Sequence, residues 1–263
     1  MIHHVTIAVR GRSALGRDER ERRLLVRALT ACAGECLLLL ALVDEHLHAA
    51  LRTARPGYLA RDLRRVLVRA RQDLQLKPAH LEPVDNRAYL SWLVRYLLTQ
   101  PQKHGVSGPA ALWTGCFLQD LAGARLLPGF DRRLLLEELP RFRLGEHFAA
   151  CGLAPVPLDP ADDEALRRAG AARVVDLAAG VFAAGPDLSQ PGRSAELLAA
   201  RVLAAQAGLT VGLPPLELAR YLGVQPRAVR RLAATRGHPW GLEALRRRLT
   251  LEERARDRVA RPA

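Results

Sequence analysis

Apolar and polar positions in the first hundred residues follow two different periods. Alternation, or a short continuous apolar run, indicates strands, whereas spacings of three and four indicate helices. Strands are expected over residues 2–9, 36–43, 45–52 and 77–84. Helices are expected over residues 17–33, 58–74 and 89–99. The order strand, helix, strand, strand, helix, strand, helix predicts an α+β protein with a ferredoxin-like antiparallel sheet.

The rest of the chain is predicted to be helical, with proline- and glycine-containing segments that separate its parts. Helices are expected over residues 113–122, 131–139, 194–208, 214–222, 226–235 and 242–258. Linkers are expected over residues 154–159 and 185–193, on either side of a small helical region rich in Ala and Val. The predicted domains are an α+β domain over 1–150, a linker with a short helix over 151–193, and an all-α domain over 194–263.

Charge narrows the class of partner. The chain carries 40 basic and 27 acidic residues, which gives a net charge of +13. An excess of this size predicts a polyanionic partner. The longest apolar run, residues 36–43, is too short to cross a bilayer, so nucleic acid is a better candidate than a membrane. The four cysteines form no CxxC pair and are expected to be reduced thiols in a cytoplasmic protein.

Two short motifs carry candidate chemistry. His46-Leu47-His48 follows the apolar strand, and side chains two residues apart on a strand share a face, so both imidazoles can reach one metal ion. Tyr96 and Gln100 lie four residues apart on a predicted helix, so they also share a face. If the two faces meet, two imidazoles and an amide surround a divalent cation beside a phenol. Such a site suits attack of the tyrosine on a phosphodiester.

The motifs and their order resemble the single-tyrosine HUH transposases, and among these most closely the REP-associated tyrosine transposases. The resemblance covers residues 1–145. It is carried by the segments 4–7, 42–48, 84–90 and 96–105, with a weaker likeness at Trp113-Thr114-Gly115. Five segments in the family's order are far more specific than a His-x-His pair alone.

The resemblance implies a fold, a reaction and a substrate. It implies an HUH nuclease core over 1–150, with Mg²⁺ or Mn²⁺ held by His46, His48 and Gln100. It implies that Tyr96 becomes a 5′-phosphotyrosine when single-stranded or hairpin DNA is cleaved. A monomer or a homodimer, associated with the nucleoid, is expected.

Two departures from the family pattern leave a second interpretation open. Asp44-Glu45 stand where the family has Pro-Asn before the first histidine, and Gln100 stands where its nearest members often have Asn. The glutamine keeps the chemistry of other single-tyrosine HUH transposases. The two carboxylates would either tune the histidines or mark a site that has drifted. The alternative to an active enzyme is therefore a DNA-binding protein or regulator that has lost cleavage.

Two groups of basic and polar residues are candidates for DNA contacts. The first lies on the helix over 58–74, where a solvated helix face is the alternative; it comprises Arg61, Arg64, Arg65, Arg69 and Arg71. The second lies in residues 216–232, which resemble a helix-turn-helix with Gly223 at the turn, similar to the DNA-binding domain of the replication initiator DnaA. Its members are Gln225, Arg227, Arg230 and Arg231. Duplex DNA is the expected partner of this second group, and a purely structural helical hairpin is the alternative.

Overall fold

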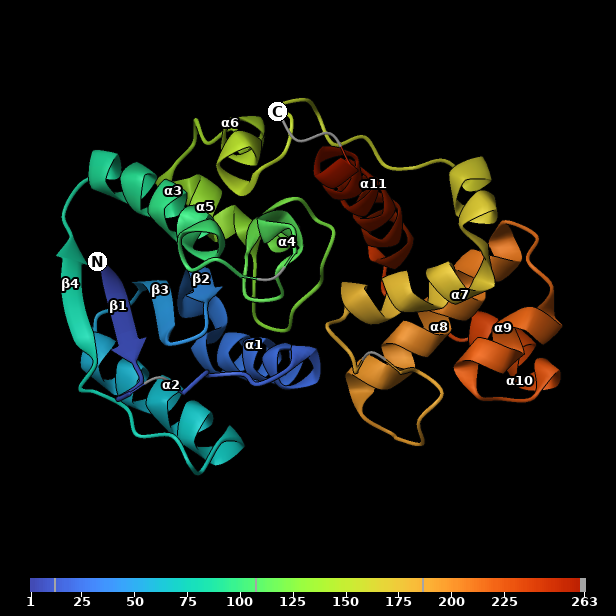
Figure 1. Ribbon diagram of the computed structural model, residues 1–263, viewed down its shortest axis with the longest axis horizontal. Helices are drawn as coiled ribbons and strands as arrows, with labels where there is room; N and C mark the ends of the chain where they lie inside the picture. The colour runs from blue at the N-terminus through green and yellow to red at the C-terminus, as the bar shows by residue number, and fades with distance from the viewer. Residues whose placement is uncertain (12, 107, 186, 261–263) are drawn as a thin grey trace. The chain divides into compact units, whose positions relative to one another are not determined.

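The computed structural model describes residues 1–11, 13–106, 108–185 and 187–260 (Figure 1). They form two compact units. The first consists of residues 1–121, 127–157 and the chain from 254, and the second of residues 122–126 and 158–253. No helix among the described residues is both long enough and apolar enough to cross a membrane.

The first unit is built on a four-stranded antiparallel sheet. Its strands are β1 (Ile2–Ala8), β2 (Leu37–Leu42), β3 (His46–Arg52) and β4 (His80–Val84), in the order β2-β3-β1-β4. Every residue of β2 is buried, which accounts for its continuous apolar run. The prediction of an α+β protein with an antiparallel sheet is confirmed, and the order of its strands and helices is the one expected.

Three long helices cover the sheet. Helices α1 (Glu19–Ala33) and α2 (Pro56–Ala70) contact each other and lie on one face, and α3 (Arg87–Lys103) lies on the other (Figure 1). The side chain of Asn86 caps α3 by accepting a hydrogen bond from the Tyr89 amide at 2.8 Å. Pro101 lies inside the last turn of α3, and the helix continues past it to Lys103. Because the start of α3 is fixed by its cap, the face that it turns to the sheet is fixed as well.

The segment after α3 differs from the expected helix over 113–122. A 3₁₀ turn at Ala110–Leu112 is followed by a short helix, α4, at Leu118–Leu121. Between them the indole of Trp113 donates to the Leu42 carbonyl at 2.7 Å, and the Leu42 amide donates to the Gly115 carbonyl at 3.0 Å. The segment therefore pairs with the edge of β2, and a Cβ at Gly115 would collide with that strand.

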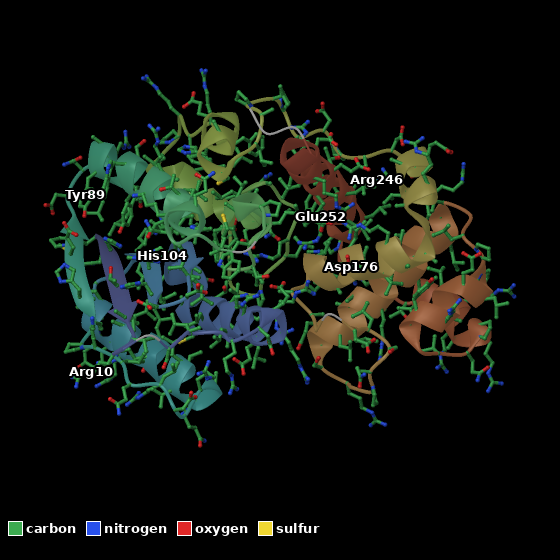
Figure 2. All side chains as sticks on the ribbon, viewed as in Figure 1. Arg10, Tyr89, His104, Asp176, Arg246 and Glu252 are labelled. Carbon is green, nitrogen blue, oxygen red and sulfur yellow. The ribbon has the colours of Figure 1, made fainter. Side chains whose placement is uncertain are left out.

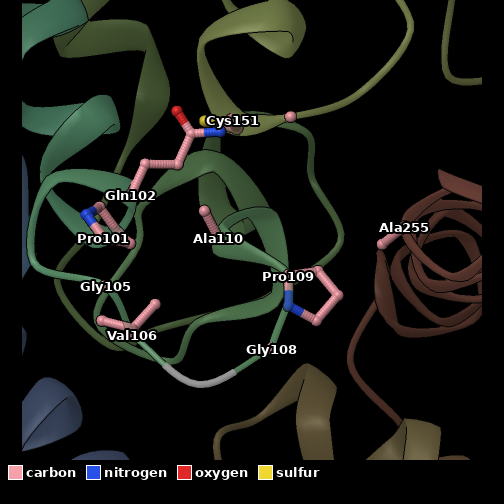
Figure 3. A pocket seen from close by; sticks show the side chains of 10 residues that line it. Pro101, Gln102, Gly105, Val106, Gly108, Pro109, Ala110, Cys151 and Ala255 are labelled. Carbon is pink, nitrogen blue, oxygen red and sulfur yellow. The ribbon is translucent and has the colours of Figure 1, made fainter. Parts of the chain in front are cut away.

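Two short helices and a cavity complete the described part of the first unit. The helices are α5 (Arg132–Glu138) and α6 (Leu144–Phe148), followed by a 3₁₀ turn at Ala149–Cys151. Near the end of α3 lies a cavity of about 330 Å³ (Figure 3). Its lining is mostly small and apolar, with Pro101, Val106, Cys151 and the polar Gln102 among its residues. None of the predicted site residues lines it, so the candidate chemistry lies elsewhere.

The second unit is helical. Its helices are α7 (Asp163–Val181), α8 (Ala195–Thr210), α9 (Pro215–Leu222) and α10 (Pro226–Ala233), together with most of α11 (Gly241–Ala260). The helical region expected within the segment 151–193 is α7, and its buried residues belong to the core of this unit. The small Ala and Val side chains of α7 pack closely against α8, so they form core rather than linker. The all-α unit accordingly begins near residue 158 instead of 194.

A tight turn joins α9 to α10. Gly223 ends α9 in the left-handed conformation at φ +64°, and a Cβ there would lie 2.7 Å from the Ser189 carbonyl oxygen. Val229 of α10 is fully buried. The glycine is required twice, once for its backbone conformation and once for the close approach of residue 189.

Replacement of Gly223 by alanine is expected to destabilise the second unit by about 2 kcal/mol or more, through left-handed strain of about 1–2 kcal/mol and the added clash. Gly212→Ala is the matched control, since Gly212 also has a positive φ of +80° but open space around its Cβ position. Urea denaturation followed by far-ultraviolet circular dichroism measures both. Equal losses for the two variants would show that the contact with residue 189 contributes nothing.

Candidate active site

Strand pairing gathers polar residues on one face of the sheet. β1 and β3 pair so that Thr6 lies opposite His48 and Ala8 lies opposite His46. β1 and β4 pair so that His4 lies opposite Glu82. Directly opposed residues of antiparallel strands point to the same face. Three strands therefore contribute polar side chains to one strip of this sheet face. Apolar side chains would ordinarily occupy these positions.

The strip is connected by close contacts around His48. Its Nδ1 atom lies 3.1 Å from Thr6 Oγ1 and 3.3 Å from His4 Nε2. His4 Nδ1 lies 3.7 Å from a carboxylate oxygen of Glu82. These contacts engage Nδ1 of His48 and leave its Nε2 atom as the nitrogen available to a ligand. A partner at one ring nitrogen fixes the orientation of an imidazole that binds metal through the other.

Helix α3 places Tyr96 against the strip. The ring centroid of Tyr96 lies 5.6 Å from that of His48 and 6.1 Å from that of His4, both in edge-on arrangements. His104, which is labelled in Figure 2, lies just past the end of the helix. Its ring centroid is 5.5 Å from that of His46. The two predicted motifs, one on β3 and one on α3, are thus brought together through Tyr96 and His48.

Gln100 is buried, and its contact is with its own helix. The side-chain amide donates from Nε2 to the Tyr96 carbonyl at 3.0 Å. No hydrogen bond joins it to His46 or His48 within the part of the chain that the structure describes. Its Oε1 atom is the one with the chemistry of a hard-cation ligand. The structure therefore brings Gln100 to the same region as Tyr96 without joining it directly to the histidines.

Burial sets the charge state of the two histidines. Burial, reinforced by His4 and His46, lowers the pKa of His48 to about 3. Burial and then His104 lower the pKa of His46, and Glu45 opposes this shift only in part. Both imidazoles are therefore neutral at pH 7, which is the form that binds a metal.

The donor types of the candidate metal site are two imidazoles and one amide oxygen. Nδ1 of His46 is buried and has no hydrogen-bond partner within the described part of the chain. With His48 Nε2 and the Gln100 amide oxygen, the set contains two imidazoles and one oxygen ligand, which suits Mn²⁺ at least as well as Mg²⁺. No cluster of three or more His, Cys, Asp or Glu side chains among the described residues is arranged to hold a metal. The candidate site depends on the glutamine for its third ligand.

Asp44 and Glu45 form the bend between β2 and β3. Their carbonyls accept hydrogen bonds from Leu15 at 2.6 Å and from Val9 at 3.0 Å, so both residues hold the segment that follows β1. Glu45 is close enough to His46 to oppose the lowering of its pKa. These backbone hydrogen bonds do not depend on the side chains, so the effect of Glu45 on the pKa of His46 is the contact through which the side-chain identity of this bend acts on the histidines.

The arginines of α2 lie on the other side of the sheet from Tyr96 (Figure 1). Arg61 lies over the ring of Tyr58 at 4.8 Å, Arg64 reaches the Leu76 carbonyl at 3.5 Å, and Arg65 pairs with Asp62 at 2.9 Å. Arg69 is exposed. Any phosphate that these four residues contact lies across the sheet from the candidate nucleophile.

Arg71 does not fit the prediction that it contacts DNA. It is buried, its guanidinium donates to Asp73 at 2.6 Å and 2.8 Å, and it also reaches the Ala14 carbonyl at 2.9 Å. A guanidinium satisfied in this way stabilises the fold and is unavailable to a phosphate. The sequence placed it on the exposed helix, but α2 ends at Ala70 and the chain turns inward there.

In the second unit, the candidate DNA contacts share one exposed surface. Gln225, Arg227, Arg230 and Arg231 are all exposed on or just before α10, while Val229 faces the core. The turn from Gly223 to Gln225 leaves α10 attached to α9 by its apolar side. This surface is basic and free of acidic side chains along α10 itself.

Sequence reasoning missed four residues near Tyr96. Thr6, His4, His104 and Trp92 are not among the site residues that the sequence predicts. The signal for His4 and Thr6 was their spacing of two on β1, but only the strand register shows that they meet His48. Trp92, which stacks on Tyr96, had the helical spacing of four as its signal.

Comparison with protein-family models, with curated proteins and with solved structures finds no match for this chain.

Replacement of Thr6 by valine is expected to weaken Mn²⁺ binding about 10- to 100-fold, as loss of an outer-shell hydrogen bond does at other metal-binding histidines. Valine keeps the shape of the side chain but removes the hydroxyl next to His48 Nδ1. Titration calorimetry without DNA measures the affinity. Thr6→Ser, which keeps the hydroxyl, is expected to bind like the wild type. Unchanged affinity in Thr6→Val would remove this residue from the site.

Proposed function

We propose that the protein is a single-tyrosine HUH endonuclease and strand transferase, a transposase or a domesticated relative of one. It nicks and rejoins single-stranded DNA beside hairpin or palindromic repeats. The observation that carries the proposal is the contact between Tyr96 on α3 and His48 on β3, whose rings lie 5.6 Å apart. A strand order of β2-β3-β1-β4, which a ferredoxin-like core requires, supports it.

In the proposed reaction, Tyr96 is the nucleophile. Its hydroxyl loses a proton and Oη bonds to phosphorus as the bond from phosphorus to the 3′ oxygen breaks. The 3′ oxygen takes a proton from solvent, so one fragment ends in a 3′-hydroxyl and the other is linked to the protein through its 5′ phosphate. The reverse attack by a 3′-hydroxyl rejoins a strand without ATP, because the phosphodiester energy is conserved in the phosphotyrosine.

Residues around Tyr96 have distinct roles in this proposal. His46, His48 and Gln100 would hold Mg²⁺ or Mn²⁺, which withdraws charge from the scissile phosphate when bound. Lys103 lies with its ammonium 4.6 Å from the Tyr96 ring centroid. A cation there attracts the DNA backbone toward the tyrosine. Thr6 and His4 hold the ring of His48 in place.

Replacement of Tyr96 by phenylalanine is expected to abolish a covalent adduct between the protein and hairpin-bearing single-stranded DNA in Mn²⁺. Denaturing electrophoresis with label at either end of the strand measures it. A 3′ label is expected to stay with the protein and a 5′ label to be released on a shorter strand. Removal of the cation by chelation is expected to stop the reaction.

Tyr89→Phe is the matched control, because Tyr89 lies on the same helix but contacts Trp92 instead of the histidines. It is expected to form the adduct. An adduct that survives in Tyr96→Phe, or no adduct in the wild type, would overturn the enzymatic proposal. Hairpin binding without cleavage would then support the second candidate, a DNA-binding regulator derived from a transposase. That candidate is favoured by the hydrogen bond that ties the Gln100 amide to its own helix.

The second unit is proposed to bind duplex DNA through α10 in the manner of a helix-turn-helix. Gln225 and Arg227 would approach the base edges, and Arg230 and Arg231 the phosphates. The double substitution of Arg230 and Arg231 by alanine is expected to reduce the slope of log affinity against log salt by about 2. Arg168→Ala, on the exposed surface of α7, is the control and is expected to leave the slope unchanged. Electrophoretic mobility shift at several salt concentrations measures both.

A further inference from the structure

Three aromatic side chains form a ladder along one side of α3. Trp92 stacks on Tyr96 with ring centroids 5.0 Å apart and an interplanar angle of 15°. Tyr89 forms the other end of the ladder. Its ring centroid lies 5.6 Å from that of Trp92, and the two ring planes are tilted by 38°. Spacings of three and four residues on a helix place the three rings in one row. The row ends at the candidate nucleophile.

The side chain of Trp92 is more exposed to solvent than a role in packing alone would require. Its side chain is 53% exposed, whereas Trp113 is 8% exposed and donates its indole N–H to a backbone carbonyl. Exposure of a large aromatic ring forgoes most of the stabilisation that its burial would give. The stack with Tyr96 covers only part of the indole, so an aromatic surface remains free next to the nucleophile.

The charges around this surface suit a nucleic acid strand. Lys103 lies over the Tyr96 ring, about two helical turns beyond the stack, and offers a positive charge to a phosphate. Exposed aromatic rings beside basic side chains are the combination by which proteins hold single strands, because every unpaired base has a face that can stack. A base in a duplex has no free face, so such a surface selects unpaired nucleotides.

We propose that Trp92 is a stacking platform for one unpaired base of the DNA strand that Tyr96 attacks. The inference rests on the proposed function for the position of the scissile phosphate. Because Trp92 lies one helical turn before Tyr96, the stacked base belongs to a nucleotide beside that phosphate. Trp92 then positions the DNA strand. Because any base can stack on the indole, this contact does not select a particular DNA sequence, but it does require that the base be unpaired.

The platform is tested by comparing two strands of equal charge. One is a twelve-nucleotide thymidine strand, and the other is a strand with the same number of phosphates and no bases. The full chain carries Trp240→Phe, which removes the exposed tryptophan of the second unit, and chelator prevents cleavage. Anisotropy measures the affinity of labelled strands, and quenching of tryptophan emission by unlabelled strands reports stacking directly.

Trp92→Ala is expected to weaken binding of the thymidine strand about 5- to 150-fold, the range found for loss of one base stack. The base-free strand is expected to bind both proteins equally, and the quenching by thymidine is expected to disappear. Trp92→Phe keeps a smaller ring and is expected to recover part of the difference. Equal weakening for both strands, or none, would overturn the platform and assign Trp92 to the support of Tyr96 alone.

The outcome is separable from that of the proposed function. Adduct formation by the wild type together with an unchanged preference for bases in Trp92→Ala keeps the enzyme and removes the platform. Base-dependent quenching without any adduct keeps the platform as a single-strand contact and removes the cleavage chemistry. Circular dichroism of each variant excludes unfolding as the cause of either loss.

Discussion

The pairing register of β1 with β3 is the constraint on which the candidate site depends. Only with Thr6 opposite His48 do the Thr6 hydroxyl and the three histidines His4, His46 and His48 point toward α3. A slip by one residue would turn the strip to the face covered by α1 and α2 and bring Val5 and Ile7 to its place. Those two residues are fully buried against the helices, so the hydrophobic core on one face fixes the polar strip on the other.

Burial of the polar strip has a cost that its internal contacts offset in part. Polar groups withdrawn from water need partners, and His48 finds two of them within 3.3 Å on β1. His46 retains one buried nitrogen without a partner in the described part of the chain. Among the described residues, His4 Nδ1 is likewise buried without a hydrogen-bond partner, 3.7 Å from a carboxylate oxygen of Glu82. The internal contacts of the strip therefore offset only part of the cost of burying it.

The local pattern of apolar and polar residues predicts most strands and helices of the first unit. It predicts only some of the residues at the candidate site. Periodicity predicted the four strands and the three long helices, because a two-residue and a four-residue repeat are both local properties. His46, His48, Tyr96 and Gln100 were found from spacing alone. His4 and Thr6 were not, since a partner across the sheet depends on register. The helical region that becomes α7 is predicted as well, but its place in the core of the second unit is not, because an Ala-rich helix buried on several sides has little amphipathic pattern to read.

The net charge predicts a polyanionic partner, but it does not predict which surface of the protein that partner would contact. Arg71 is buried and paired with the exposed Asp73, and the α2 arginines lie across the sheet from Tyr96. The positive charge beside the candidate nucleophile comes instead from Lys103, one of only two lysines in the chain. The proposed single-strand contact therefore rests on one ammonium and one indole of α3 and not on the abundance of arginine. A stack on an exposed ring needs no charge of its own, so the proposal does not require an arginine-rich surface beside Tyr96.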